Sequence, residues 1–517
     1  MKQTGIIPGT NGGVLIDDLQ YTYHANSNQL KSVNDLAFGG SNVQNGKQGD
    51  FKNFVPSTGI DYEYDKNGNL KNDKNKNIIN GGADGIINNF LDLTQQIIIN
   101  GKSKTEFTYD AAGNKLAKKV TQLAPGSPQP ITTYYVGGLV YEGQAGATET
   151  LTLQYIINEE GKLRIMDPVA AWSGPSGQVN YLETHGNTEI GNTGTPNKWG
   201  VWDYFIKDNL GNIRMVLTEE YHQQQMLCSM EATPPVRKNE EEATFGNTTN
   251  NEVANTRYST TSLPWQPSLY VSKLIYVNPG VQPPTTIGPN TILKVMAGDI
   301  LNGTAKYYYQ SSGQSNNTNN GIIANIANSL FGFLQNPGNV SGVIKDNVSN
   351  NFLSSNGGPL QPFLTNNNPP PSNTKTPKAF LNYIFFDEQF RYVQESSGAL
   401  PVPQLQGNQT SSSGDLAPFY AKATKNGYVY IYLSNESSNV PVYFDDFRVT
   451  HTRGPIVEDN AFYPFGLRMQ GISAKAALKP ASKYGYQGDN CEQDEETGYN
   501  EFALRTYDPQ IGRFIHP

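Results

Sequence analysis

The stretch TEFTYDAAGNKLAKKV, residues 105–120, contains the pattern that decides the fold. Aromatic and polar residues alternate in residues 106–109, which is typical of a strand with one buried face. Residues 110–114 have turn chemistry, because Asp and Asn side chains bond to nearby backbone and Gly113 tolerates a positive φ. Lys115 begins a return strand. The stretch therefore predicts a β-hairpin.

The same order of strand, acidic turn, Gly-Asn and strand recurs in the N-terminal part of the chain. YEYDKNGNLKND, residues 62–73, is a close copy, and weaker copies occupy residues 21–30 and 204–214. Because the offset from Asp to Gly-Asn is kept, we expect repeats of one unit. The alternative is an ordinary antiparallel meander with common turn residues.

The composition is typical of a β-rich extracellular protein with many turns. The 517 residues include 30 tyrosines and 51 glycines, and only 16% are charged. This length allows about three or four domains. The net charge of −8 argues against a nucleic-acid partner. The two cysteines, Cys228 and Cys491, cannot form a disulfide framework or a zinc site on their own. We expect a secreted or cell-surface location.

No membrane span is expected, because no apolar stretch reaches the ~18–20 residues that a span needs. The longest is GIIANIANSLFGFL, residues 321–334, and it contains Asn. The opening MKQTGIIPGTNGG lacks the basic start and apolar core of a signal peptide. The chain begins within a hairpin pattern and stops at Pro517, so we expect a fragment of a longer protein.

The texture of the sequence predicts four segments. Residues 1–220 are expected to form successive hairpins of one sheet. Residues 221–240 are expected to be a polar linker, and residues 241–452 an inserted β-sandwich. The hairpin texture returns in residues 453–517. The two ends of the insertion are expected to lie close in space.

The insert carries strand-like segments between loops rich in Asn, Pro and Ser, which predicts a jelly-roll-like β-sandwich. Within it, the apolar residues of 321–335 cluster on one helical face, and a second helix is expected over 339–354. The segment 321–354 is therefore predicted to be a small helical hairpin docked on the sandwich. The alternative is a membrane-active hairpin.

The closing residues show a resemblance to a known family. YDPQIGRF, residues 507–514, resembles the RHS-associated core motif, and DYFIKDNLGNIR, residues 203–214, matches the upstream core segment. YPFGL (463–467) and YGYQG (484–488) are similar to forms seen in Bacteroidetes members. The Tyr-Asp hairpins resemble YD repeats. The chain thus resembles RHS/YD-repeat proteins over residues 1–220 and 453–517, and the insert looks like one found in that Bacteroidetes group.

The resemblance implies a mainly β fold in which antiparallel YD-repeat hairpins spiral into a hollow shell. In polymorphic toxins and in the C component of Tc complexes, such a shell encloses a C-terminal cargo, and teneurins use a related shell for adhesion. The function expected here is structural, not enzymatic: a shell fragment that encapsulates or presents a C-terminal effector domain missing from this chain. The expected partners are that effector domain and a secretion machinery, with type IX secretion as the route.

The resemblance also implies a self-cleavage alternative. In several family members an aspartyl self-cleavage in the core region releases the cargo, and the cleavage aspartates would lie beyond Pro517. Two carboxylates sharing a proton are what such chemistry requires. Asp508 is interpreted as a turn residue ahead of Pro509, and Arg513 matches the arginine of the core. The residues assigned to the core motif are Tyr507, Asp508, Pro509, Gly512, Arg513 and Phe514.

A second alternative is a surface adhesin that binds glycans through the insert. In YVYIYL, residues 428–433, Val, Ile and Leu are expected to face the sandwich core, so Tyr428, Tyr430 and Tyr432 would line the opposite face. Such an aromatic row can stack on sugar rings. The competing interpretation is that these tyrosines pack on the shell.

A structural calcium ion is the only cofactor that the sequence suggests. The expected opening strand of the insert, residues 240–245, and the strand VYFDDFRV resemble the ends of carbohydrate-binding jelly rolls. Calcium requires several oxygen ligands. The candidate ligands are Glu241, Glu242, Asp445 and Asp446. The competing interpretation is that these acids are solvated.

Overall fold

The structure is a computed structural model. It describes residues 2–7, 14–36, 51, 59–144, 150–167, 180–186, 188–190, 198–233, 235–246, 252–260, 263–264, 270–275, 286–311, 322–335, 358, 360–367, 375–437, 440–469, 472–477 and 482–517. The chain divides into two compact units. Unit 1 comprises Met1–Asp167, Gly186–Glu219 and Val457–Pro517, and unit 2 comprises Pro168–His185 and Glu220–Ile456.

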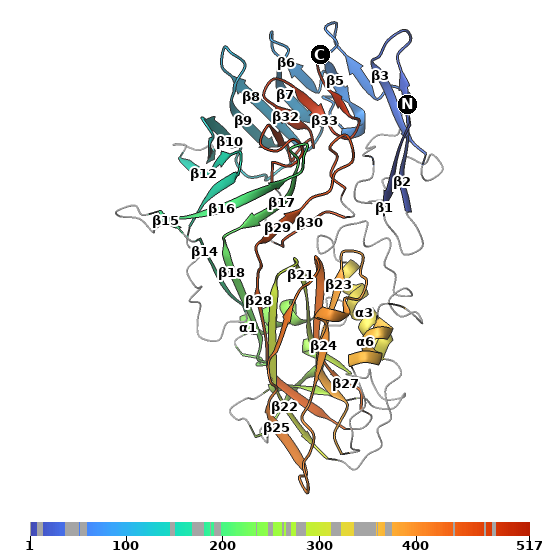
Figure 1. Cartoon of the computed structure of the whole chain (residues 1–517), viewed down its shortest axis with the longest axis vertical. Helices are drawn as coiled ribbons and strands as arrows, with labels where there is room; N and C mark the ends of the chain where they lie inside the picture. Colours follow the sequence, from blue (N-terminus) through green and yellow to red (C-terminus); the bar gives the residue numbers. More distant parts are fainter. Residues whose placement is uncertain are drawn as a thin grey trace. The chain divides into compact units, whose positions relative to one another are not determined.

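The fold is mainly β with antiparallel sheets, as the sequence predicted. Unit 1 is built on a thirteen-stranded sheet in which successive hairpins lie next to one another (Figure 1). Its strands are β6 Ile86–Asn88, β7 Thr94–Ile99, β8 Ser103–Tyr109, β9 Lys115–Gln122, β10 Ile131–Val136, β11 Leu139–Gln144, β12 Leu151–Asn158, β13 Gly161–Met166, β15 Thr188–Ile190, β16 Lys198–Lys207, β17 Ile213–Thr218, β29 Ile456–Asp459 and β30 Ala474–Lys475.

Smaller sheets complete unit 1. At the N-terminal end, one sheet has three strands and another has two, followed by a short 3-10 helix; near the C-terminus, four strands form a further sheet. These elements are β1 Lys2–Ile7, β2 Val14–Tyr23, β3 Leu30–Asp35, β4 Tyr62–Tyr64, β5 Leu70–Asp73, η1 Lys74–Lys76, β31 Cys491–Gln493, β32 Asn500–Phe502, β33 Thr506–Asp508 and β34 Arg513–Phe514. The N-terminal 220 residues therefore do not form one continuous sheet, contrary to the expectation.

One turn geometry recurs in the predicted hairpins. In β8–β9, one Asp110 carboxylate oxygen accepts the amides of Ala112 (2.9 Å) and Asn114 (2.8 Å), and the other accepts the Asn114 side-chain amide at 2.8 Å. Gly113 has φ +88°, which disfavours any side chain there. The turns at Asp65 and Asp208 have the same bonds. The local pattern thus encodes the hairpin directly.

The same turn also occurs where the sequence pattern does not show it. Between β6 and β7, Asn89 accepts the amides of Leu91 (2.9 Å) and Leu93 (3.0 Å), and Asp92 takes the positive-φ position at +58°. In unit 2, Asp387 builds a similar turn with Phe390 at φ +57°. The turn is therefore not specific to the repeats.

Unit 2 is a two-sheet structure. One sheet has eight strands and the other has four. The eight strands are β14 Asn180–His185, β18 Tyr221–Cys228, β19 Arg257–Ser259, β20 Tyr270–Leu274, β22 Ile300–Gln310, β25 Ser411–Asp415, β26 Phe419–Lys422 and β28 Val442–Thr452. The four are β21 Ile287–Val295, β23 Ala379–Asp387, β24 Gly398–Pro401 and β27 Gly427–Asn435. The helical elements are α1 Pro235–Phe245, α2 Glu252–Thr256, α3 Ile322–Gln335, α6 Leu360–Asn367 and η2 Gln394–Ser396.

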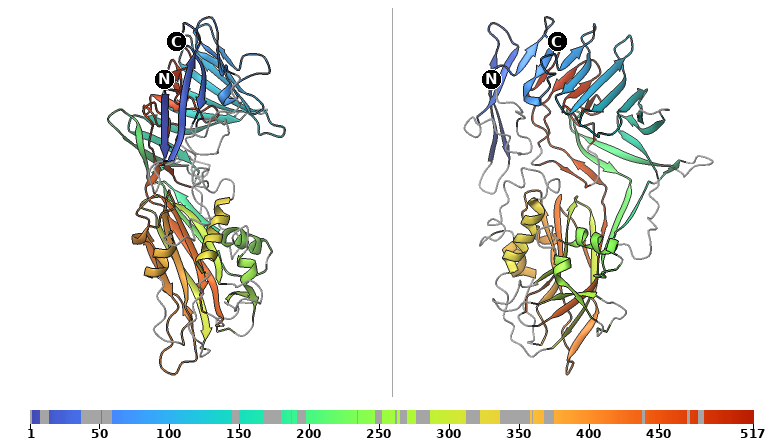
Figure 2. Two further views of the ribbon diagram at one scale, coloured as in Figure 1. Left: turned by 90° about the vertical axis from the view of Figure 1, so that its right-hand side faces the viewer. Right: turned by 180° about the vertical axis from the view of Figure 1, so that it is seen from behind.

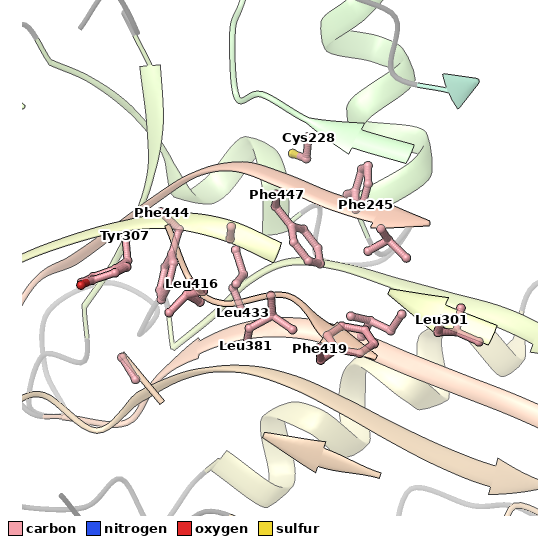
Figure 3. Close-up of a cluster of buried hydrophobic side chains, with 14 of the residues drawn as sticks. Cys228, Phe245, Leu301, Tyr307, Leu381, Leu416, Phe419, Leu433, Phe444 and Phe447 are labelled. Carbon is pink, nitrogen blue, oxygen red and sulfur yellow. The ribbon is translucent and has the colours of Figure 1, made fainter. Parts of the chain in front are cut away.

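The main core of unit 2 lies between its two sheets (Figure 3). Phe444 and Phe447 of β28 meet Leu433 of β27 and Leu381 of β23 there. A second core lies on the other face of the four-stranded sheet, where α3 and α6 cover it (Figure 2). The four-stranded sheet is therefore buried on both faces, and β27 is buried along its whole length.

The boundaries of the insert differ from the prediction. Residues 221–240, expected to be a linker, contain β18 and the start of α1, because Met226 and Cys228 alternate into the core. The strand expected at 240–245 is part of α1. Residues 180–185, assigned by the sequence to the shell, form β14 and pair with β18 of unit 2.

The helical segment is partly as expected. α3 spans Ile322–Gln335, whereas the helix expected over 339–354 lies outside the described residues. α6 occupies Leu360–Asn367, where no helix was expected. The ends of unit 2 lie side by side, because β18 pairs with β28 from Gln223↔Thr452 to Cys228↔Phe447.

Removing the carboxylate from a repeat turn should destabilise unit 1. Asp65→Ala leaves the amides of Asn67 and Asn69 without their side-chain acceptor, at an expected cost of about 1–2 kcal/mol in the free energy of unfolding. Urea unfolding measures this. The matched control is Asp84→Ala, which removes only a surface ion pair with Lys71 and should cost about 0–1 kcal/mol. Equal effects of the two variants would contradict the role given to the turn.

Candidate functional site: the docked C-terminal segment

Residues 482–517, here called the C-terminal segment, pack against the repeat strands of unit 1 (Figure 1). Tyr499, Ile511 and Ile515 lie next to the strands of its sheet, β31–β34. They belong to one hydrophobic core with Phe107 and Tyr62 of the repeats. The backbone amide of Leu70 also donates to the carbonyl of Ile515 at 2.7 Å. Apolar packing and backbone bonds therefore hold this segment to the hairpins.

A buried ionic cluster, here called the lysine cluster, joins β9 to the C-terminal segment. Lys118 contacts Asp494 at 2.8 Å and Glu501 at 3.0 Å. Lys115 contacts Glu501 at 2.6 Å and Glu492 at 3.1 Å. Lys118 and the three carboxylates are each less than a tenth exposed. Two residues from one repeat strand thus bind three acids that are distant in sequence.

The charges of this cluster are balanced. Lys483 lies 3.8 Å from Glu492, so three ammonium groups face three carboxylates. The hydroxyl of Tyr135, on β10, donates to Glu492 at 2.7 Å. Buried ions are tolerated only when they are paired and hydrogen-bonded. Each carboxylate of the cluster has a lysine partner and accepts at least one hydrogen bond, and Oε1 of Glu492 is the one oxygen of the cluster without a hydrogen-bond partner among the described residues.

The lysines determine the ionisation of the acids. Burial alone would raise the pKa of Glu492, but the ammonium groups of Lys115 and Lys118 outweigh it and hold the pKa at about 2. Burial also opposes the ionised form of Asp494, yet Lys118 lowers the pKa of Asp494 below its usual value. Burial opposes the charge of Lys118 as well, but Glu501 and Asp494 raise its pKa. These shifts favour the charged forms of Glu492, Asp494 and Lys118 at neutral pH.

A second buried cluster, here called the aspartate cluster, joins η1 to β33. Lys76 contacts Asp508 at 2.7 Å, and both side chains are buried. Its ammonium also lies 3.9 Å from the centre of the Tyr499 ring. The Tyr499 hydroxyl donates to Asp73 at 2.9 Å. The Lys76 ammonium thus pairs directly with Asp508, while Asp73 accepts the Tyr499 hydroxyl and the backbone amide of Lys76.

Ionising both carboxylates of this cluster, Asp73 and Asp508, costs free energy because both are buried and carry like charges. Burial raises the pKa of Asp73 to about 7, and Asp508 adds to the rise, while Lys76 opposes it. Oδ2 of Asp508 has no hydrogen-bond partner among the described residues. Sequence reasoning did not find this pair, because Asp73 and Asp508 are far apart in the chain.

Asp508 does act as a turn residue, as interpreted from the sequence. Its carboxylate accepts the amide of Gln510 at 2.9 Å, and its carbonyl accepts the amide of Gly512 at 2.9 Å. Pro509 lies in this turn and is buried. The ion pair with Lys76 is a further role that the motif alone does not show.

The other core-motif residues fix the position of this hairpin. Arg513 donates to the carbonyl of Asn28 at 3.0 Å and to the hydroxyl of Tyr23 at 3.2 Å. The Tyr507 ring lies 5.1 Å from that of Phe514. The arginine thus links the closing hairpin to the first repeat.

The motifs quoted from the sequence come together in space. The Tyr507 hydroxyl donates to the carbonyl of Phe465 at 2.9 Å. A Cβ at Gly512 would lie 3.0 Å from the Phe465 ring, and one at Gly466 would lie 2.5 Å from the Tyr486 ring. These glycines are therefore required for close approach. YPFGL, YGYQG and YDPQIGRF form one packed contact.

The upstream hairpin at Asp208 joins the same contact. Asn212 accepts the amide of Gln487 at 3.0 Å, and the amide of Ile213 donates to the carbonyl of Gly485 at 2.8 Å. Lys207 pairs with Asp489 at 2.7 Å. Four motifs that are distant in sequence thus support one another.

The most important site residues were not singled out from the sequence. Lys115 and Lys118 stand in the stretch quoted first, and Lys76 follows the other close copy. Lysines on the return strand after Gly-Asn were a visible signal. Their buried position was not visible, because a single lysine on a strand usually faces solvent.

The proposed glycan-binding row on β27 is not at the surface. Tyr430 and Tyr432 are fully buried and Tyr428 is 4% exposed. Val429, Ile431 and Leu433 face the inter-sheet core as expected, so the tyrosines do point the other way. That face is covered by α3 and α6 rather than by solvent, and sugars cannot reach these rings.

The proposed calcium ligands are occupied by the protein itself. Glu241 accepts the amide and hydroxyl of Ser229 at 2.8 and 2.6 Å. Glu242 pairs with Arg257 at 2.6 Å, and Asp446 pairs with Lys306 at 2.7 Å.

Asp445 is buried, and its carboxylate accepts the amide of Asp446 at 2.8 Å. Within the described part of the chain, no three His, Cys, Asp or Glu side chains are grouped as a metal site requires. The calcium hypothesis therefore has no support in the geometry of the residues named for it.

None of the helices in the described residues is long and apolar enough to cross a membrane.

Cys228 and Cys491 are both buried free thiols. Burial raises the pKa of Cys491 to about 12, so this thiol is protonated and unreactive at neutral pH.

The similarity of the chain to known proteins is weak. No family model matches the chain, and no curated protein matches it. Among solved structures, the crystal structure of TcdB2-TccC3 is similar at 11% identity and a TM-score of 0.20, over 97% of this chain and 21% of that one. The crystal structure of TcdB2-TccC3-TEV is similar at 11% identity and a TM-score of 0.14, over 89% and 20%. The chain spans about one fifth of each, and TM-scores this low do not show a shared fold.

Breaking the lysine cluster should destabilise unit 1. Lys118→Met leaves Asp494 and Glu501 buried without their shared cation, so we expect a loss of about 3–5 kcal/mol in the free energy of unfolding. Lys119→Met is the matched control, because Lys119 is the next residue, is exposed and faces away. Its expected effect is within about 0.5 kcal/mol. Urea unfolding, with hydrogen exchange in β31–β34 as a local readout, distinguishes the two. Similar losses in both variants would show that the ion pairs do not hold the segment.

The stability of unit 1 should fall between about pH 4 and pH 7 because of Asp73. Its folded pKa of about 7 lies above the unfolded value near ~3.9, so its contribution is complete below the unfolded pKa and is lost as the pH rises through the folded one. Asp73→Asn removes this titration. The drop in unfolding free energy from pH 5 to pH 8, measured with urea, should be smaller in the variant by a few kcal/mol, at about 1.4 kcal/mol per pKa unit. An unchanged drop would show that Asp73 is ionised throughout.

Proposed function

We propose that this chain is a structural part of a β-repeat shell that encloses or presents a C-terminal effector domain. The observation that carries the proposal is the docking of the C-terminal segment on the repeats through two buried ionic clusters. A segment anchored in this way fixes the path of whatever polypeptide follows it. The resemblance of the closing motifs to the RHS-associated core supports the same interpretation.

The cost of the arrangement supports an anchoring role. Burying several charges is expensive, and an apolar contact of equal volume would be at least as stable. Directional ion pairs instead specify one position for the segment. The convergence of YPFGL, YGYQG and YDPQIGRF around Gly466 and Gly512 adds a steric constraint on that position.

The alternative of self-cleavage stays a prediction. Asp73 and Asp508 form a buried pair with a raised pKa at Asp73, but Lys76 lies against Asp508 and both acids serve structural contacts. We propose no catalytic role for them. Secretion, including a type IX route, is likewise proposed from the resemblance alone.

The test uses the gene product that includes the residues encoded after Pro517. Limited proteolysis, read by intact mass, follows how fast the downstream polypeptide is digested. We expect protection in the wild type and rapid digestion in the double variant Lys115→Met/Lys118→Met, because the anchor of the segment is lost. Lys119→Met should digest like the wild type.

Two outcomes separate the hypotheses. Digestion at the same rate in the wild type and in the double variant would contradict the shell proposal. Spontaneous splitting of the wild type shortly after Pro517, absent from Arg513→Ala, would instead favour the self-cleaving alternative. Circular dichroism of each variant shows whether it has folded.

A further inference from the structure

Unit 2 carries a row of tyrosines on the outer face of its eight-stranded sheet. Tyr258 of β19, Tyr443 of β28 and Tyr308 of β22 follow one another across the strands. The ring centres of Tyr258 and Tyr443 lie 6.0 Å apart, and those of Tyr308 and Tyr443 also lie 6.0 Å apart. These three residues, here called the tyrosine row, come from segments that are distant in sequence.

The register shows that the row faces away from the inter-sheet core. Tyr308 lies directly opposite Tyr443, and Lys273 of β20 lies opposite Tyr443 on its other side. The neighbours Val442 and Phe444 point into the core instead. Tyr258 is 42% exposed, and the other two rings are partly exposed. The tyrosine row is therefore unlike the buried tyrosines of β27.

Hydrogen-bonding groups surround the rings. The Lys273 ammonium lies 4.4 Å from the centre of the Tyr258 ring. The Gln310 side-chain amide donates to the Tyr308 hydroxyl at 2.6 Å. Ser413 of β25 lies opposite Tyr308 and is exposed. Aromatic faces bordered by polar groups suit a ligand with one apolar face and hydroxyls at its rim.

The charges beside the row are engaged within the protein, since the Lys273 ammonium lies over the Tyr258 ring. Lys306 and Asp446, on the same face, neutralise each other at 2.7 Å. Stacked bases of single-stranded nucleic acid also bind aromatic rows, but they require a positively charged groove, and this chain carries a net charge of −8. A pyranose ring has an apolar C–H face and a hydroxyl rim, so it matches without requiring a compensating charge.

We propose that the tyrosine row is a binding site for a neutral polysaccharide chain that lies across the strands of the eight-stranded sheet. The rings of Tyr258, Tyr443 and Tyr308 stack on successive sugar residues, and the polar side chains beside them bind the hydroxyls. This site is independent of the proposed shell function, because all of its residues belong to unit 2.

The test is affinity electrophoresis of the full chain through gels that contain laminarin, hydroxyethylcellulose, mannan or xylan, with alginate and poly(dT) as charged probes. We expect at least one neutral polysaccharide to retard the protein. Tyr258→Ala and Tyr443→Ala should each weaken that binding about tenfold, since stacking on an aromatic ring is worth roughly one such factor. Tyr443→Phe keeps the ring and should retain most of the binding.

Tyr420→Ala is the matched control. Tyr420 is 70% exposed on β26 of the same sheet, but it lies opposite Asn302, outside the row. Its removal should leave retardation unchanged. The proposal is overturned if no neutral polysaccharide retards the wild type, if only alginate or poly(dT) does so, or if Tyr420→Ala weakens binding as much as Tyr258→Ala. Because Tyr258 is exposed, its variant tests the site even if Tyr443→Ala does not fold.

Discussion

The pairing of Lys118 with Asp494 and Glu501 is the interaction on which unit 1 depends. A repeat hairpin buries little by itself, and its neighbours must cover it. Here the covering layer is the C-terminal segment, which is polar at the place where it meets β9. The lysines make that contact directional, and the aspartate cluster adds a second fixed point near the chain's end. Without these pairs, apolar packing and a few hydrogen bonds, such as that from the Leu70 amide to the Ile515 carbonyl, would define the cover of the repeats.

The local part of the fold was readable from the sequence. The Asp-to-Gly-Asn offset predicted the hairpins at Asp65, Asp110 and Asp208, because a five-residue turn is specified by its own side chains and one positive φ. The hairpin at Asn89 was missed, since Asn and Asp92 replace the two marker residues. The turn at Asp387 shows that the pattern is also not specific, because the same side-chain bonds form a turn in unit 2 that belongs to no repeat.

Contacts between distant segments could not be read in this way. The alternation of β27 correctly separated Tyr430 and Tyr432 from Ile431, but it could not show that helices cover the tyrosine side. In β22 the run Tyr307–Tyr309 alternates too, and only the middle ring, Tyr308, faces outward. Which face of a strand meets solvent depends on elements that a local pattern does not contain. The acids of α1 were misread for the same reason, because their partners Ser229 and Arg257 lie on other elements.

The side-by-side ends of unit 2 have a consequence for the order of folding. β17 and β29 occupy neighbouring places in the large sheet, yet the larger segment of unit 2, Glu220–Ile456, separates them in the chain. Gln223 and Thr452 lie near the two ends of this segment. Their side chains are hydrogen-bonded although 229 positions separate them in the chain. Once unit 2 has folded, the chain between β17 and β29 behaves as a short connection, which removes roughly 3–4 kcal/mol of loop-closure entropy. The last strands of the repeat sheet therefore join it most readily after the insert is complete, so that a domain placed within the sheet assists the closure of the sheet.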